Sequence, residues 1–272
     1  MIGTRLINGT ESTRVSADDR GLLYGDGLFE TMAATDGRVR HLDLHLARLE
    51  EGCRRLGMPM PSQGLITEEC RRVLEGIGNA TVKLIITRGS GPRGYRPPSE
   101  PTITRIVMAM APRPRGDTVP PLVVRLCQTR LAQSPLLAGL KHLNRLEQVM
   151  ACAEWDDPEI GEGLMLSMDG RLVSATAANV FLVLAGRLVT PDIRDCGVSG
   201  VMRQVVLAAA RELGAPAEVE DLRPESLDVA EEVFVTNAVI GIRPVGELMG
   251  VRQWPVGEVT RALMARVNGA AG

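Results

Sequence analysis

The sequence predicts an α+β protein made of two domains, and three observations support this. One segment has the apolar spacing of an amphipathic helix, several short apolar segments carry the turn signals of strands, and a Pro-rich stretch divides the chain near its middle. With 272 residues, 44% of them hydrophobic, the chain is long enough to bury the cores of two medium domains.

The clearest element of the first half is a helix within residues 40–57. Its apolar residues recur at spacings of four and three: Leu42, Leu46, Leu49, Cys53 and Leu56. Gly57 and Pro59 end this pattern. Around it we expect two strands within 27–40 joined by an Asp36-Gly37 turn, a helix at 65–77, and strands at 81–88 and 102–111.

The stretch APRPRGDTVPP (111–121) interrupts this pattern as a linker would. We therefore predict an N-terminal α+β domain at 1–111, a linker at 112–121 and a C-terminal domain at 122–272. In the latter we expect helices at about 144–155 and 200–214, and strands at 122–127, 163–168, 179–184, 187–190 and 231–237. Short strands mixed with few helices favour a curved or barrel-like sheet.

Composition excludes several classes of protein. The net charge is −2 with few aromatic residues, which argues against nucleic-acid binding. No membrane span or signal peptide is recognisable, so we expect a cytoplasmic protein. The five cysteines are scattered, and His41 and His45 have no evident third ligand, so we expect neither disulfides nor a bound metal.

Lysine is rare in this chain, which has two lysines against 29 arginines. Lys141 follows an irregular loop and precedes a helix, where a desolvated amine could act as a nucleophile toward carbonyls and form a Schiff base. The alternative is a solvated surface lysine. Lys83 lies within a strand pattern, and we expect it at an edge or on the surface.

Three segments could hold a phosphate group. Gly197 and Gly200 precede a helix whose first backbone N–H groups, with the helix dipole, favour an anion. Thr236 and Asn237 end an apolar strand, although such pairs often only form turns. Arg48 lies on the polar side of the first long helix, where most arginines are merely solvated.

Several strings resemble the class IV pyridoxal-phosphate enzymes and occur in the same order along nearly the whole chain. They are DRGLLYGDGLFET, RGSGPRGY, LKHLNRLEQV, NVFLV, GVSGVMRQ and VTNAVIGIRPV. The strings KHLNRLEQ and RGSGPRGY are most similar to the aminodeoxychorismate lyases of that family. The resemblance implies a two-domain fold type IV structure like that of D-amino-acid aminotransferase, with pyridoxal 5'-phosphate in the interdomain cleft of a homodimer whose site includes residues of the partner chain.

The resemblance also implies residue roles. Lys141 would bind the cofactor covalently and move the proton, with Thr31 near the reacting carbon. Asn179 belongs to the cofactor-binding motif, and the phosphate ligands would be Arg48, the backbone N–H groups of Val201 and Met202, and Thr236. Arg93 and Tyr95 would face the substrate, since a guanidinium suits the carboxylates of a chorismate-type molecule.

One position departs from the family pattern. Five residues before Asn179, where the family has a Glu that pairs with the pyridine nitrogen, this chain has Ser174. Either Thr176 or a water takes that role, or the Ser174 hydroxyl donates to a neutral ring, or the local alignment slips. The implied reaction is elimination of pyruvate from 4-amino-4-deoxychorismate to give 4-aminobenzoate for folate synthesis; the alternative is a branched-chain or D-amino-acid aminotransferase.

Overall fold

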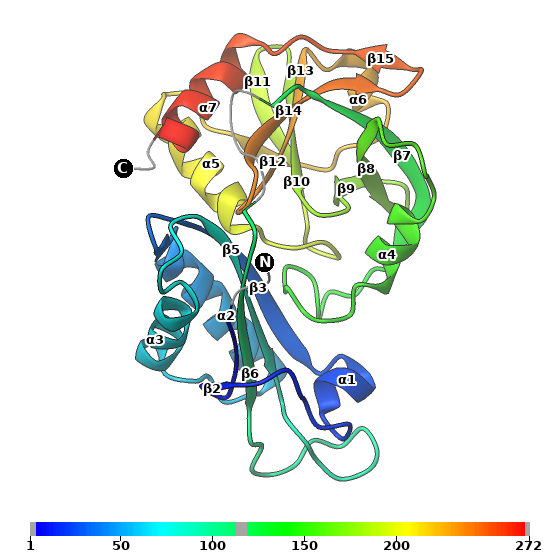
Figure 1. The fold of residues 1–272 in the computed structure, drawn as a ribbon. Coiled ribbons are helices and arrows are strands. Elements are labelled where there is room, and N and C mark those ends of the chain that lie inside the picture. The colour runs from blue at the N-terminus through cyan, green and yellow to red at the C-terminus, as the bar shows by residue number, and fades with distance from the viewer. Residues whose placement is uncertain (1–3, 113–118, 270–272) are drawn as a thin grey trace. The chain divides into compact units, whose positions relative to one another are not determined.

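The computed structural model describes residues 4–112 and 119–269 (Figure 1). The chain forms two compact units. Unit 1 comprises Met1–Arg113 with Leu140–Asn144, and unit 2 comprises Pro114–Gly139 with Arg145–Gly272. Most of the linker expected at 112–121 falls on residues 113–118, outside the described residues, so that boundary stays a prediction.

The elements of unit 1 are β1 (Arg5–Ile7), β2 (Thr10–Glu11), α1 (Arg20–Tyr24), β3 (Gly27–Thr35), β4 (Arg38–Val39), α2 (Leu42–Leu56), α3 (Gln63–Val73), β5 (Ala80–Thr87) and β6 (Thr104–Met110). Those of unit 2 are β7 (Leu122–Leu131), α4 (Leu146–Cys152), β8 (Ile160–Ser167), β9 (Leu172–Ala175), β10 (Asn179–Leu184), β11 (Arg187–Pro191), α5 (Val201–Glu212), β12 (Glu218–Glu220), α6 (Ser226–Val229), β13 (Glu232–Asn237), β14 (Gly241–Leu248), β15 (Arg252–Gln253) and α7 (Glu258–Gly269). The α+β class is confirmed.

Two sheets organise these elements. In unit 1 the strand order is β2-β1-β6-β5-β3-β4, and all neighbours are antiparallel. In unit 2 the order is β12-β11-β10-β13-β14-β7-β8-β9, with β15 paired to β14, and the sheet is mixed. The strand β14 is not predicted from the sequence, because Pro244 and Gly246 weaken its strand pattern.

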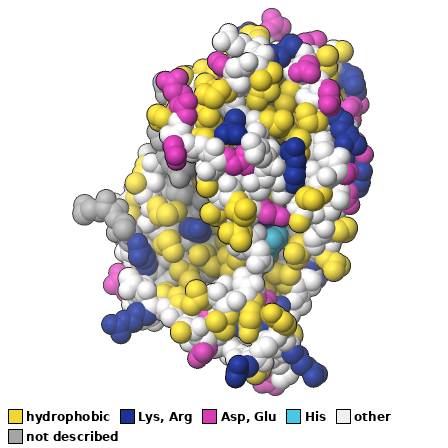
Figure 2. All heavy atoms as spheres, turned by 90° about the vertical axis from the view of Figure 1, so that its right-hand side faces the viewer, with side chains coloured by type: hydrophobic (Ala, Val, Ile, Leu, Met, Phe, Trp, Pro, Cys, Tyr) yellow, Lys and Arg dark blue, Asp and Glu magenta, His cyan; other side chains and the backbone are white. Residues whose placement is uncertain are grey.

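Apolar side chains also reach the surface of unit 2. The helix α4 lies on the face of the molecule shown in Figure 2, and its Leu146, Val149 and Met150 are all exposed. Exposed apolar groups of this kind are typical of surfaces that contact another protein.

Among the described residues, no helix combines the length and the apolar character needed to cross a bilayer.

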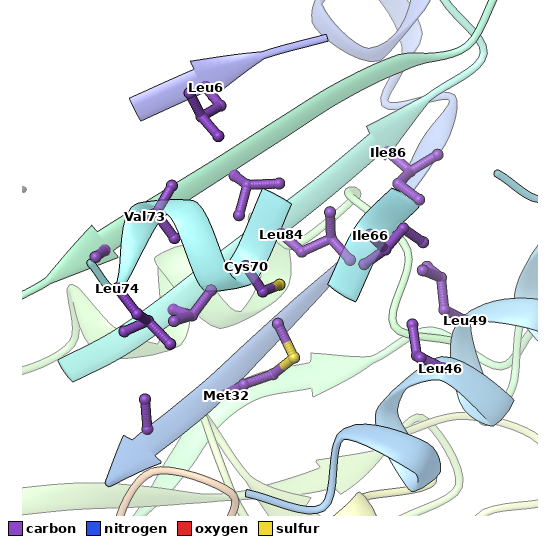
Figure 3. Packing of buried hydrophobic residues seen from close by; sticks show 14 of the residues in the cluster. Leu6, Met32, Leu46, Leu49, Ile66, Cys70, Val73, Leu74, Leu84 and Ile86 are labelled. Atoms are coloured by element: carbon purple, nitrogen blue, oxygen red, sulfur yellow. The ribbon is translucent and has the colours of Figure 1, made fainter. Parts of the chain in front are cut away.

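The core of unit 1 lies between its sheet and two helices. Met32 of β3 and Leu84 of β5 pack against Leu49 of α2 and Ile66 of α3, and all four are at most 1% exposed (Figure 3). The apolar positions that predicted the helix at 40–57 are thus the face that α2 buries. One face of β3 is committed to this core, and the alternate residues of the strand point the other way.

The core of unit 2 has two layers, one on each face of the strand pair β10 and β13. Along β10, Val180 and Leu182 pack with one cluster, whereas Phe181 packs with a second cluster that includes α5 and α7. Phe181 stacks on Phe234 of β13, with ring centroids 5.0 Å apart. Because both faces are buried, β10 reads as the continuous apolar run NVFLVL.

We expect Phe181→Ala to lower the free energy of unfolding by about 3–5 kcal/mol, because it removes a fully buried ring and leaves a cavity beside Phe234. Urea denaturation followed by circular dichroism would measure the change. The control is Met168→Ala, at a side chain that is 66% exposed, where we expect a change within about 0.5 kcal/mol. Equal effects of the two substitutions would contradict the assignment of this core.

Candidate functional site

The backbone of Lys141 is paired with β3 of unit 1. Phe29 N donates to the Lys141 carbonyl over 3.0 Å, and Leu143 N donates to the Gly27 carbonyl over the same distance. His142 forms a β-bridge with Leu28. Lys141 is therefore anchored to β3 although the preceding loop is irregular, and its Nζ lies 4.2 Å from the centroid of the Phe29 ring.

The two lysines of the chain and Thr31 lie on the same face of the sheet as the Phe29 ring. Residues 29 and 31 alternate with the core-facing Leu28 and Met32, so they share the other face of β3. Thr31 is opposite Lys83 in the pairing of β3 with β5, and Lys83 Nζ lies 5.3 Å from the Phe29 ring centroid.

We expected Lys83 at an edge or on the surface. The edge position is wrong, since β5 lies between β3 and β6, and the residue is partly buried. The proximity of Lys83 to the Phe29 ring beside Lys141 was not predicted from the sequence. The rarity of lysine was the one signal that could have linked them, because a chain that otherwise uses arginine places both of its lysines against the same ring.

Arg48 is largely buried, in contrast to most arginines on a helix surface. Its Nε donates to Glu30 Oε1 over 2.8 Å, and a second guanidinium nitrogen pairs with Glu30 Oε2. Nδ1 of His45 lies 2.6 Å from Glu30 Oε2. Burial alone would raise the pKa of Glu30, but the charge of Arg48 and the hydrogen bond with His45 lower it below its usual range. A buried carboxylate thus orients the Arg48 guanidinium.

Arg93 and Tyr95 lie on the exposed loop between β5 and β6. The Tyr95 side chain is 85% exposed, and its ring meets the edge of Tyr24 at a centroid distance of 5.4 Å. The carbonyls of Gly94 and Tyr95 accept hydrogen bonds from Arg20, which the sequence analysis did not single out. Both expected substrate contacts therefore belong to a loop that is tied to α1.

In unit 2, Ser174 lies on β9 and is 7% exposed. Among the residues that the structure describes, its hydroxyl has no hydrogen-bond partner. The hydroxyl of Thr176, the alternative considered above, is paired with the carboxylate of Glu162, which also accepts from the backbone N–H of Gly163. Burial raises the pKa of Glu162, and these hydrogen bonds oppose that shift. Ser174 therefore keeps a free donor, whereas Thr176 does not.

The start of α5 has no side-chain cap, and the N–H groups of Val201 and Met202 lie in this uncapped first turn. Their side chains are buried in the core of unit 2. Asn179 holds the preceding segment, because its Nδ2 donates to the Val198 carbonyl over 2.9 Å. A Cβ on Gly200 would lie 2.1 Å from Asn179 Oδ1, so this close approach requires glycine.

Thr236 and Asn237 organise the turn between β13 and β14. The Thr236 hydroxyl is fully buried and donates to the Gly241 carbonyl over 2.8 Å, so its proton is used inside the turn. Asn237 Oδ1 accepts from the backbone N–H groups of Val239 and Ile240, each over 2.9 Å. These contacts fit the turn-forming alternative, and a phosphate contact by Thr236 stays a prediction.

The described part of the chain contains no cluster of three His, Cys, Asp or Glu side chains able to hold a metal ion. The polar groups of the predicted site are instead an amine, a guanidinium, hydroxyls and the N–H groups at the start of a helix. Such a set can form a bond to an aldehyde and bind a phosphate group.

Comparison with known proteins identifies relatives along almost the whole chain. The family model of amino-transferase class IV matches residues 27–248. An aminodeoxychorismate lyase of Vibrio harveyi is 33% identical over 96% of this chain and 98% of its own length. A putative branched-chain-amino-acid aminotransferase of Methanocaldococcus jannaschii is also 33% identical, over 93% of this chain and 90% of its own length.

Solved structures agree with this relationship. The 4-amino-4-deoxychorismate lyase of Pseudomonas aeruginosa matches with a TM-score of 0.89 and 46% identity, over 96% of this chain and 97% of that one. The Escherichia coli branched-chain amino acid aminotransferase shares the fold, with a TM-score of 0.85 at 23% identity over 97% of this chain and 93% of that one. The chain belongs to the class IV aminotransferase family of pyridoxal-phosphate enzymes and has its fold type IV structure.

Proposed function

We propose that this protein is a 4-amino-4-deoxychorismate lyase, which eliminates pyruvate from its substrate and releases 4-aminobenzoate. One observation carries the proposal. The Lys141 amine lies over the Phe29 ring, on the face of β3 that also carries Thr31, in a chain 46% identical to the lyase of Pseudomonas aeruginosa. The alternative is an aminotransferase, favoured by the equal identity to the Methanocaldococcus jannaschii relative.

The donor set fits pyridoxal phosphate. Lys141 would supply the amine for the aldehyde. The first turn of α5 has no side-chain cap, and its backbone N–H groups lie at the positive end of the helix dipole, which favours a phosphate group. We assign Arg48 to the phosphate as well, with Glu30 fixing the plane of its guanidinium. When bound, the cofactor supplies a ring that withdraws electrons from the carbon next to the substrate nitrogen.

Lys141 Nζ is proposed to take the proton from that carbon. Its backbone is fixed by β3, so the amine reaches the substrate from a defined direction. The hydroxyl of Thr31 is proposed to donate to the ether oxygen that leaves with pyruvate. Arg93 is proposed to pair with a substrate carboxylate, and Tyr95 to contact the substrate ring.

Ser174 is proposed to set the choice between elimination and amino transfer. A hydroxyl donates a hydrogen bond to a neutral pyridine nitrogen, whereas a carboxylate in its place would hold a proton there. A neutral ring stabilises negative charge less well, which disfavours the longer route of amino transfer. Elimination remains feasible because its product is aromatic.

The protein is further proposed to act as a homodimer. The exposed apolar side chains of α4, Leu146, Val149 and Met150, provide a surface that association would remove from water. In this proposal the partner chain completes the site.

We expect the purified protein to be yellow and to lose this absorbance on Lys141→Arg, because the guanidinium cannot form the covalent bond to the aldehyde. Turnover should fall by about 10²–10⁴-fold or more with loss of the proton-transfer group. Borohydride reduction and peptide mass mapping should find the cofactor on Lys141 in the unaltered protein. Lys83→Arg is the matched control and should keep the label. A colourless protein that does not take up added cofactor would exclude this function.

We expect 4-amino-4-deoxychorismate to be converted into 4-aminobenzoate and pyruvate far faster than any amino acid is deaminated. The measurement pairs product detection by chromatography with an aminotransferase assay that uses branched-chain and D-amino acids with 2-oxoglutarate. Efficient keto-acid production without formation of 4-aminobenzoate would refute the lyase and establish the alternative.

We expect Ser174→Glu to raise amino transfer relative to elimination and to prolong the long-wavelength absorbance seen during turnover, because a carboxylate keeps the ring nitrogen protonated. Ser174→Ala is the control, since it removes the hydroxyl without adding a charge and should leave amino transfer low. If Ser174→Glu changes neither the spectrum nor the ratio of the two reactions, Ser174 does not contact the ring nitrogen.

A further inference from the structure

The loop at residues 89–95 has no regular secondary structure, yet one buried side chain holds it. Arg20 Nη1 donates to the Gly94 carbonyl over 3.0 Å, and Nη2 donates to the Tyr95 carbonyl over 2.9 Å. Arg20 is 3% exposed although the loop itself is at the surface. Its guanidinium therefore binds the two peptide units that follow Arg93.

The first part of the loop also contacts Arg20. The backbone N–H of Arg20 donates to the Gly89 carbonyl over 2.9 Å. A Cβ built on Gly91 would lie 3.2 Å from Arg20 Cδ, so the loop passes close to the aliphatic part of this side chain. Both the beginning and the end of the loop therefore contact Arg20.

Arg20 is held in turn by the partly buried carboxylate of Asp26. Its Nε donates to Asp26 Oδ2 over 2.8 Å, and Arg88 Nε donates to the same oxygen over 2.8 Å. The other nitrogens of Arg88 donate to the Leu56 and Gly57 carbonyls at the end of α2. Burial tends to raise the pKa of Asp26, but the hydrogen bonds from Arg88 and Arg20 lower it, so the carboxylate stays ionised.

We propose that Arg20 is a positioning residue that keeps the 89–95 loop in one conformation and so places Arg93 and Tyr95 for substrate binding. The assignment of Arg93 and Tyr95 to the substrate rests on the proposed function. The holding of the loop does not, because it follows from the hydrogen bonds that Arg20 makes to Gly94 and Tyr95. A guanidinium is suited to this role, since it can serve a carboxylate and two carbonyls at once from one rigid plane.

The test compares Arg20→Lys with Arg88→Lys. Both substitutions keep a positive charge next to Asp26, and both lose the pair of carbonyl hydrogen bonds. The lost bonds join the loop in the case of Arg20 and the end of α2 in the case of Arg88. Trypsin can cut after the exposed Arg93, whereas Pro97 protects the bond after Arg96. We expect cleavage after Arg93 to be about tenfold faster in Arg20→Lys than in Arg88→Lys or the unaltered protein, as loss of these bonds frees the loop.

The kinetic readout separates positioning from a general loss of structure. In Arg20→Lys we expect KM for 4-amino-4-deoxychorismate to rise about tenfold, with kcat and the cofactor absorbance nearly unchanged. Arg88→Lys should leave KM unchanged. If Arg20→Lys does not fold, Tyr24→Leu removes the ring beside both Arg20 and Tyr95 and should also speed cleavage after Arg93.

Equal cleavage rates in the Arg20 and Arg88 variants would overturn the proposal, whatever reaction the enzyme performs. Faster cleavage with unchanged KM would show that the loop is held by Arg20 but does not bind substrate, and would overturn the placement of Arg93 and Tyr95. Absence of lyase activity in the unaltered protein would count against the proposed function only, because the tryptic comparison needs no substrate.

Discussion

The pairing of residues 141–143 with β3 is the constraint on which the candidate site of unit 1 depends. Two backbone hydrogen bonds and a β-bridge attach this segment to β3 of the antiparallel sheet. A lysine side chain has many rotamers. Because its backbone is fixed, the Nζ atom can reach only a limited region of space. The same strand carries Phe29 and Thr31, so the amine, the ring and the hydroxyl share one rigid element.

Because side chains alternate along β3, the same strand also contributes to the ion pairs on the face of the sheet that α2 covers. The face opposite Phe29 and Thr31 carries Glu30, whose carboxylate is shared by His45 and Arg48 of α2. A buried carboxylate left without partners would cost several kcal/mol, so this cluster constrains how α2 lies on the sheet. The strand thereby sets the position of Arg48 from one face and that of Lys141 from the other.

In unit 2, a side-chain hydrogen bond fixes the segment before a helix and leaves the start of that helix uncapped. Asn179 at the start of β10 holds the Val198 carbonyl, and the glycine at position 200 allows the side chain to come close. The first turn of α5 is thus presented without a side-chain cap. Nearby in the sequence, Glu162 takes up the Thr176 hydroxyl and leaves that of Ser174 available. Polar groups that are already hydrogen-bonded within the fold are less able to bind a ligand than those that are not.

Much of this could be predicted from the amino-acid sequence alone. Apolar spacing identified α2 and the buried strand β10, because burial on one face or on two leaves a periodic pattern in the chain. The rarity of lysine drew attention to Lys141, and the motifs predicted the family. Local pattern was sufficient in these cases because each signal is carried by neighbouring residues.

Other features required the tertiary structure, because they depend on residues far apart in the chain. Lys83 joins Lys141 only through strand pairing, and Arg20 reaches Gly94 and Tyr95 across 74 and 75 residues of sequence. The hydrogen bond from the Thr236 hydroxyl to the Gly241 carbonyl likewise appears only in the folded chain. A sequence states which donors and acceptors exist, whereas only the folded chain decides which of them are already paired, since a hydrogen bond depends on distance and direction in space.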